Sequence, residues 1–255
     1  MLLAIDVGNT QTVIGLYGVD DSLLYHWRIS TVPDRTADEH ALLVTQLLDL
    51  EGVDDADITG IAVCSTVPHL TAVMREMTAR WPSIEAVVVE PGVKTGLPIL
   101  YENPREVGAD RIANAVAAWE MYGGPSIVVD FSGTATIIDA ITGKGEYLGG
   151  AIIPGIEISL DALFERAASL RQVELVEPRS AIGRNIVESV QSGALYGFAS
   201  QVDGLCRRFV AELGPATVIA TGSLSALMAP LSECIEYQEP WLTLHGLRLI
   251  YRKNT

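Results

Sequence analysis

The sequence predicts an α/β fold built from two similar halves, each with three strands followed by alternating helices and strands. The first observation is a repeated element, at residues 2–16 and again at 126–138, in which an apolar strand ends in a carboxylate, turns at glycine and continues into a second apolar strand. The second is its spacing, because a threonine follows each carboxylate, Asp6 and Asp130, by four residues. A repeated element of this kind indicates the architecture of the whole chain.

In the first half, apolar runs between turn residues indicate strands, and apolar residues at helical spacing indicate helices. The expected strands are Leu2–Val7, Thr12–Tyr17, Leu23–Ile29, Ile61–Cys64 and Ala86–Val89. The expected helices are Thr36–Leu50, His69–Arg80 and Asp110–Met121. A polar loop rich in proline and glycine separates the last strand from the last helix.

The second half repeats this order. Its expected strands are Ser126–Phe131, Ala135–Ile141, Gly145–Ile152 and Val218–Ala220. Its expected helices are Ile156–Leu170, Ile186–Leu213, a short helix after Ser223, and Leu242–Tyr251. Each half is therefore a βββαβα unit of the ribonuclease-H-like kind, with insertions. We place the halves at residues 1–123 and 124–255 and expect a ligand cleft between them.

The composition of the chain restricts the classes of function that it can have. The 255 residues are 49% hydrophobic and carry a net charge of −15, which predicts a large core and disfavours binding to nucleic acid or an anionic membrane. The chain starts directly in a strand and has no apolar run of membrane-spanning length, so we expect a cytoplasmic protein. The three cysteines, Cys64, Cys206 and Cys234, fit neither a disulfide framework nor a zinc site, and we expect them to be small buried apolar residues.

The first turn has the chemistry of a phosphate loop. Gly8 and Asn9 both tolerate positive φ, and such a turn directs backbone N–H groups and the Thr10 hydroxyl at an anion such as a nucleotide phosphate. The Asp6 carboxylate would repel that phosphate directly, but it can act on it through a divalent cation.

Seven segments together, in order and at their separations, resemble type III pantothenate kinases of the sugar-kinase/actin superfamily. They are Asp6–Thr10, Glu106–Arg111, Val129–Thr134, Leu148–Gly155, Ile182–Asn185, Gln191–Gly193 and Leu242–Leu247. The resemblance covers essentially the whole chain. It implies an actin-like ATPase/sugar-kinase fold, ATP-dependent phosphorylation of the 4′-hydroxyl of pantothenate as the first step toward coenzyme A, and a homodimer that completes the substrate pocket across its interface.

The resemblance also assigns roles around the substrate. Asp110 matches the general base, while the residues alone equally allow an N-cap of the following helix. Arg111 matches a residue that holds the substrate, for which a surface arginine is the alternative. The small residues Gly108 and Ala109 leave the carboxylate open to the substrate. Tyr101 matches an aromatic residue of the pantothenate pocket, for which a loop tyrosine covering the core is the alternative.

ATP and its cations are assigned in the same way. Asp6 is expected to hold Mg²⁺ through water, and Asp130 matches the residue that binds a monovalent cation, K⁺ or NH₄⁺. Thr134 matches a contact to ATP. The first phosphate loop consists of Asp6, Val7, Gly8, Asn9, Thr10, Gln11, Thr12 and Val13.

Three positions depart from the family pattern. Ser132 lengthens the second loop by one residue, which would shift Thr134 or displace the cation at Asp130. Ile186 stands at a substrate-binding position where the family has a hydroxyl. Ser223 follows Gly222 where a second glycine is usual. These departures leave two alternatives to the kinase: a catalytically impaired relative acting as a binding or regulatory accessory factor, and another small-molecule kinase of the superfamily.

Overall fold

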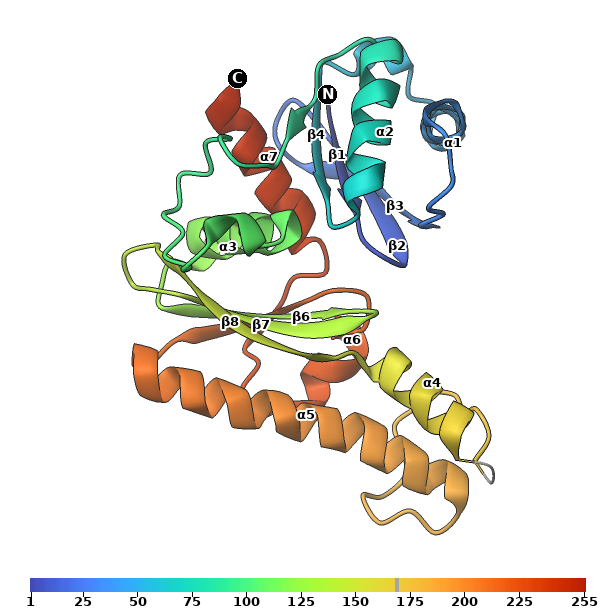
Figure 1. Cartoon of the computed structure of the whole chain (residues 1–255), viewed down its shortest axis with the longest axis vertical. Helices are drawn as coiled ribbons and strands as arrows, with labels where there is room; N and C mark the ends of the chain where they lie inside the picture. The colour runs from blue at the N-terminus through green and yellow to red at the C-terminus, as the bar shows by residue number, and fades with distance from the viewer. Residues whose placement is uncertain (168–169) are drawn as a thin grey trace. The chain divides into compact units, whose positions relative to one another are not determined.

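The computed structural model describes residues 1–167 and 170–255 (Figure 1). The chain forms two compact units, one of Met1–Ala117 with Leu242–Thr255 and one of Ala118–Trp241. Each unit contains a five-stranded mixed sheet with helices.

The first unit has the strand order β3-β2-β1-β4-β5. Its strands are β1 Leu2–Val7, β2 Gln11–Tyr17, β3 Leu23–Ser30, β4 Gly60–Ser65 and β5 Val87–Val88. Its helices are α1 Ala37–Leu50, α2 Pro68–Arg80, the first part of α3 Ala109–Tyr122, α7 Leu242–Asn254, and the short 3₁₀ helices η1 Asp55–Asp57 and η2 Pro104–Glu106. The central strand β1 is antiparallel to β2 and parallel to β4.

Alternation along the strands separates two faces of this sheet. Leu3, Ile5 and Val7 belong to the apolar cluster formed with α1 and α2. The intervening positions point to the opposite face, because successive side chains of a strand alternate. On that face α7 packs closely, since a Cβ added to Gly15 would lie 2.7 Å from the Leu244 side chain. Asp6 lies between two residues of the apolar cluster and is therefore directed away from it.

The second unit repeats the topology, with the order β10-β9-β6-β7-β8. Its strands are β6 Ser126–Ser132, β7 Ala135–Ile141, β8 Tyr147–Pro154, β9 Thr217–Thr221 and β10 Tyr237–Gln238. Its helices are α4 Ile156–Arg166, α5 Ile186–Leu213, α6 Ser225–Met228 and the 3₁₀ helix η3 Ala229–Leu231. Like β1, the central strand β6 is antiparallel to its hairpin partner and parallel to the strand on its other side. The duplicated α/β order predicted from the sequence is confirmed.

Helix boundaries follow from identifiable caps. Thr36 is the N-cap of α1 and forms a capping box with Glu39, so the helix begins one residue later than predicted. Asn185 caps α5, whose bounds match the prediction. The helix expected at 156–170 ends as α4 at Arg166, and residues 168 and 169 of that expectation lie outside the described residues. The two-residue strand β10 was not predicted.

The C-terminal helix α7 packs on β1, β2 and β4 and so belongs by its contacts to the first unit, although its sequence position suggested the second half. Cys64 and Cys206 are buried as expected, whereas Cys234 is only half-buried, with its sulfur 3.3 Å from the Ser232 hydroxyl. Within the residues that the structure describes, no helix is long and apolar enough to cross a membrane.

Candidate active site

The first loop is a tight connection between β1 and β2. Val7 pairs with Thr12, and the Gly8 N–H donates a hydrogen bond of 3.0 Å to the Gln11 carbonyl. Across the described residues, the positions with positive φ do not include Gly8 or Asn9, so the turn forms without the left-handed conformation that these residues tolerate. Glycine is needed at this position for a different reason, because a Cβ there would lie 2.9 Å from the Gln11 carbonyl oxygen.

The segment that follows β3 forms hydrogen bonds to this loop. The Thr31 N–H donates a hydrogen bond of 2.9 Å to the Thr10 carbonyl, and the hydroxyls of Thr12 and Thr31 are also 2.9 Å apart. Thr12 is buried, whereas Asn9 and Thr10 are exposed. The loop therefore presents the two exposed side chains to solvent, while the Thr12 hydroxyl stabilises the loop itself.

Cys64 lies beside Asp6, because β4 pairs with β1 in a register that matches these two residues. The Cys64 thiol donates a hydrogen bond of 3.1 Å to Asp6 Oδ1. Complete burial, followed by the charges of Asp6 and Asp110, raises the pKa of the Cys64 thiol well above its usual range. The thiol is therefore neutral and acts as a donor. From the sequence, Cys64 was predicted only as a small buried apolar residue. Its position at the carboxyl end of a strand parallel to β1 could have indicated that it lies at the site.

Asp110 lies inside the first turn of α3, not before it, because the helix begins at Ala109. The N-cap alternative is therefore wrong. A carboxylate in the first turn still interacts favourably with the positive end of the helix dipole. Its Oδ1 atom is buried and lies against Gly108, where a Cβ would come within 2.4 Å of it. Gly108 thus makes room for the carboxylate.

Arg111 is only 6% exposed, so the surface-arginine alternative is also wrong. A guanidinium in the first turn of α3 supplies a buried positive charge next to Asp110 in the chain. Tyr101 is half-buried in the loop before η2. The end of this loop is ordered by Asn103, whose Nδ2 donates a hydrogen bond of 2.8 Å to Glu106.

The second hairpin, formed by β6 and β7, has the same pairing register as the first. Asp130 pairs with Ile137 and Asp6 pairs with Val13, so in both hairpins the carboxylate faces the residue seven positions later. Ser132 pairs with Ala135 and extends the ladder by one step, which leaves a two-residue turn. The added serine is absorbed into β6, and the turn residue Thr134 stays exposed.

Asp130 is 6% exposed and closely surrounded. The Ser132 hydroxyl donates a hydrogen bond to its Oδ1. Gly222, with φ of +91°, packs against the same oxygen, and a Cβ there would lie 2.5 Å from it. The residue before this glycine, Thr221, pairs with Asp130 across β9 and β6. A carboxylate near the end of the central strand thus recurs in the second unit, where it is buried.

Ile186 is the first residue of α5 and is 57% exposed. It lines a pocket of 860 Å³ between α4 and the beginning of α5. The pocket is apolar along Leu160 and Leu163 and polar at Arg184 and Asn185. The predicted substrate contact at Ile186 therefore lies at an accessible pocket of the second unit, whereas Tyr101 and the α3 residues belong to the first.

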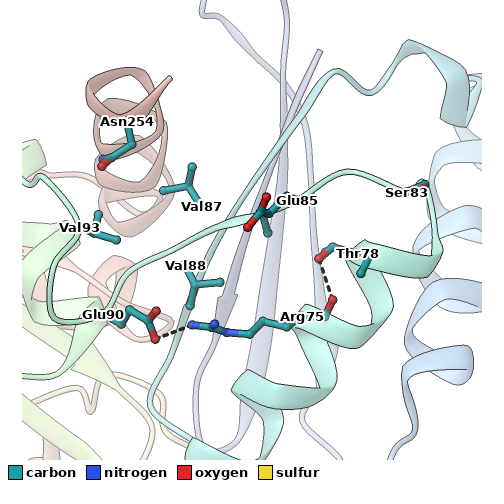
Figure 2. Close-up of a pocket in the computed structure, with 11 residues that line it drawn as sticks. Arg75, Thr78, Ser83, Glu85, Val87, Val88, Glu90, Val93 and Asn254 are labelled. Carbon is teal, nitrogen blue, oxygen red and sulfur yellow. Dashed lines mark hydrogen bonds and ion pairs between the residues drawn. The ribbon is translucent and has the colours of Figure 1, made fainter.

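The first unit has another pocket, of 630 Å³, beside α2, β5 and the end of α7. Figure 2 shows Arg75 and Glu90 forming an ion pair across it and the Thr78 hydroxyl bonded to the Arg75 carbonyl. None of the predicted site residues lines this pocket. It is therefore separate from the candidate active site.

Among the described residues, no group of three or more His, Cys, Asp or Glu side chains could hold a metal ion. A divalent cation at Asp6 would therefore be held by one carboxylate together with water and phosphate oxygens. Mg²⁺ is commonly bound in this way, and the accessible donors of the adjacent turn suit the phosphates. The residues present fit a magnesium nucleotide better than a permanently bound metal.

Solved structures share this architecture. The activator of 2-hydroxyisocaproyl-CoA dehydratase from Clostridium difficile, with bound ADPNP, matches 98% of this chain and 93% of its own, with a TM-score of 0.54 and 10% identity. The inorganic polyphosphate/ATP-glucomannokinase from Arthrobacter sp. strain KM matches 99% of this chain and 97% of its own, with a TM-score of 0.52 and 15% identity. The fold is that of the actin-like ATPases and sugar kinases.

Sequence comparison is more specific. The family model of type III pantothenate kinase matches residues 2–208. Type III pantothenate kinases from Streptomyces avermitilis and Moorella thermoacetica are 55% and 54% identical over the whole chain, which covers 98% and 100% of their lengths. The chain belongs to the type III pantothenate kinase family.

Proposed function

We propose that the protein transfers the γ-phosphoryl group of ATP to the 4′-hydroxyl of pantothenate, the first step of coenzyme A synthesis. Family membership supports the reaction. The observation that carries the residue assignment is the arrangement around Cys64, whose thiol bonds to Asp6 and lies within the electrostatic influence of Asp110. Two carboxylates from different elements of the first unit thus both act on one buried thiol.

Asp110 is the general base in this proposal. Its carboxylate accepts the proton of the attacking hydroxyl as the phosphoryl group is transferred, a role that contributes about 10²–10⁴-fold to rate. Arg111 orients the substrate, because a guanidinium pairs well with the carboxylate of pantothenate. Tyr101, Gly108, Ala109 and Ile186 complete the proposed substrate contacts.

The first loop binds the nucleotide. Asn9 and Thr10, with the backbone N–H groups of the turn, donate hydrogen bonds to phosphate oxygens and stabilise the charge that develops there. Asp6 holds the magnesium ion through water. When bound, Mg²⁺ neutralises phosphate charge and aligns the γ-phosphate.

Asp130 is proposed to hold the monovalent cation, and Thr134 to donate to ATP. The matching registers of the two hairpins support this assignment. Asp130 pairs with the residue seven positions later, as Asp6 does, although Ser132 is present in the second hairpin. A homodimer is proposed as well. Two large apolar side chains, Ile186 in the lining of the 860 Å³ pocket and Ile182 shortly before it in the chain, are exposed and suit coverage by a second copy.

The test is direct detection of phosphorylated pantothenate by mass spectrometry, with ATP and Mg²⁺, in the presence and absence of K⁺ or NH₄⁺. We expect turnover that depends on the monovalent cation. A folded protein that binds ATP or pantothenate without turnover would contradict the kinase assignment and favour a binding or regulatory role. Turnover of a different small alcohol, with none of pantothenate, would favour another kinase of the superfamily.

A further inference from the structure

The segment Leu242–Leu247 begins α7 and contains none of the residues assigned to the reaction. Its Thr243 hydroxyl donates a hydrogen bond of 2.8 Å to the side-chain oxygen of Asn114 on α3. Asn114 is 1% exposed. The two helices also touch through their backbones, because a Cβ on Gly246 would lie 1.9 Å from the Ala113 carbonyl oxygen. This part of α7 is therefore closely fitted to α3.

The contact lies one helical turn after Asp110. Residues four apart lie on the same face of a helix, and helical side chains lean toward the helix N-terminus. The Asn114 side chain therefore leans toward the turn that carries Asp110. Its oxygen accepts from Thr243, which fixes the orientation of the amide and places the NH₂ group on the other side of the amide carbon.

We propose that Asn114, oriented by Thr243, is a positioning residue that directs its amide N–H toward the Asp110 carboxylate and holds that carboxylate in its reactive orientation. This inference rests on the proposed function of Asp110 as the base. Thr243 is not a catalytic residue in this account. It acts through Asn114, and α7 supplies a hydroxyl that determines which end of the amide faces the first turn of α3.

The orientation matters because an amide has two different ends. An N–H directed at Asp110 stabilises the ionised form that accepts a proton, whereas a carbonyl oxygen directed there would repel it. A displaced catalytic group of this kind can cost up to about 10²-fold in rate. The effect should appear in kcat, since Asn114 is buried in the helix contact.

The test compares Thr243→Val with Thr243→Ser. Valine keeps the shape and removes the hydroxyl, so we expect kcat for pantothenate phosphorylation to fall about tenfold or more, with the KM values for ATP and pantothenate changed less than about twofold. Serine keeps the hydroxyl and should stay within about threefold of wild type. A serine variant as slow as the valine variant would overturn the proposal.

Thr78→Val is the matched control. Thr78 is also a buried threonine of the first unit, and its hydroxyl donates a hydrogen bond to the Arg75 carbonyl of its own helix, as Figure 2 shows. We expect this variant to lose stability without losing kcat. The quantity to compare is the loss of kcat for each degree of Tm lost. If this ratio is the same in Thr243→Val and in Thr78→Val, the Thr243 hydroxyl has only a structural role and the proposal is wrong.

A second readout does not require turnover. The ¹³C carboxyl resonance of Asp110, assigned with Asp110→Asn, is titrated in wild type and in Thr243→Val. We expect the midpoint to move upward in the valine variant, because the carboxylate loses a fixed donor. An unchanged midpoint would overturn the positioning role, even in a protein without kinase activity. Absence of turnover in wild type, with the shift present, would instead contradict the proposed function alone.

Discussion

The Cys64 thiol donates a hydrogen bond of 3.1 Å to Asp6 Oδ1 across the parallel pair β1 and β4. In the second unit the corresponding carboxylate, Asp130, also accepts a hydrogen bond from a small side chain, the hydroxyl of Ser132. The two carboxylates are therefore held by different means, one from the neighbouring strand and one from the same strand. This difference distinguishes the two proposed phosphate loops of an otherwise duplicated architecture.

Removal of the Cys64 hydrogen-bond donor should weaken the binding of Mg²⁺ at Asp6. In Cys64→Ala the Asp6 carboxylate loses a hydrogen bond worth about 1 kcal/mol, so the Mg²⁺ concentration for half-maximal activity should rise about threefold to tenfold. Cys64→Ser retains a donor and should stay closer to wild type. Calorimetric titration with Mg²⁺ and ADP measures the same effect without turnover. Equal Mg²⁺ dependence in all three proteins would show that the thiol does not orient Asp6.

Ser132 should compete with the monovalent cation. Its hydroxyl occupies Asp130 Oδ1, so Ser132→Ala makes that oxygen more available, and the K⁺ concentration for half-maximal activity should fall about threefold, which corresponds to the loss of a weak hydrogen bond. Activity is measured against K⁺ at constant ionic strength. A higher K⁺ requirement would mean that the serine oxygen is itself a ligand.

A hydroxyl at position 186 should raise the kcat/KM for pantothenate. Ile186 is exposed at the mouth of the pocket formed with α4, where the family resemblance expects a hydroxyl. Ile186→Thr should raise kcat/KM for pantothenate about tenfold, the value of one added hydrogen bond to a polar substrate. Val187→Thr, at the next exposed position, is the control and should have no effect. An equal gain in both variants, or none in either, would remove position 186 from the substrate site.

His40 should make the protein sensitive to acid. It is 2% exposed in α1, and its Nε2 has no hydrogen-bond partner among the described residues. Burial, followed by the charge of Arg35, lowers the pKa of His40 from 6.5 to about 4. Between these two values the unfolded chain takes up a proton that the folded protein does not, so the free energy of unfolding should fall as pH falls through this window.

Urea unfolding at pH 7, 5 and 4 measures this effect. The loss should be at most about 3 kcal/mol by pH 4. His40→Phe should reduce the pH dependence, whereas His69→Gln, at an exposed position, should not. An unchanged slope in His40→Phe would assign the acid sensitivity to other groups.

Local patterns predicted most of the fold. Alternating or continuous apolar residues located the strands, and the predicted starts of α1 and α5 agree with the structure to within one residue. The duplicated order followed from the repeated strand–carboxylate–turn element. The place of α7 could not be predicted, because it depends on contacts with strands more than 170 residues earlier in the chain.

The site was only partly predictable for the same reason. Asp6, Asp110 and Asp130 were identified from motifs, and the structure shows the close packing around each of them. Cys64 was missed because its role depends on strand register, which aligns it with Asp6. The place of Ser132 could not be predicted, because counting residues cannot show that this serine pairs with Ala135 and extends the ladder.

The most direct test of the account is the activity of Asp110→Asn. The substitution keeps the shape of the side chain beside Gly108 and removes the proton acceptor. We predict that kcat for pantothenate phosphorylation falls by about 10²–10⁴-fold, while the Tm and the affinities for ATP and pantothenate stay near those of wild type. A folded variant whose kcat remains within about tenfold of wild type would contradict the assignment of Asp110 as the general base.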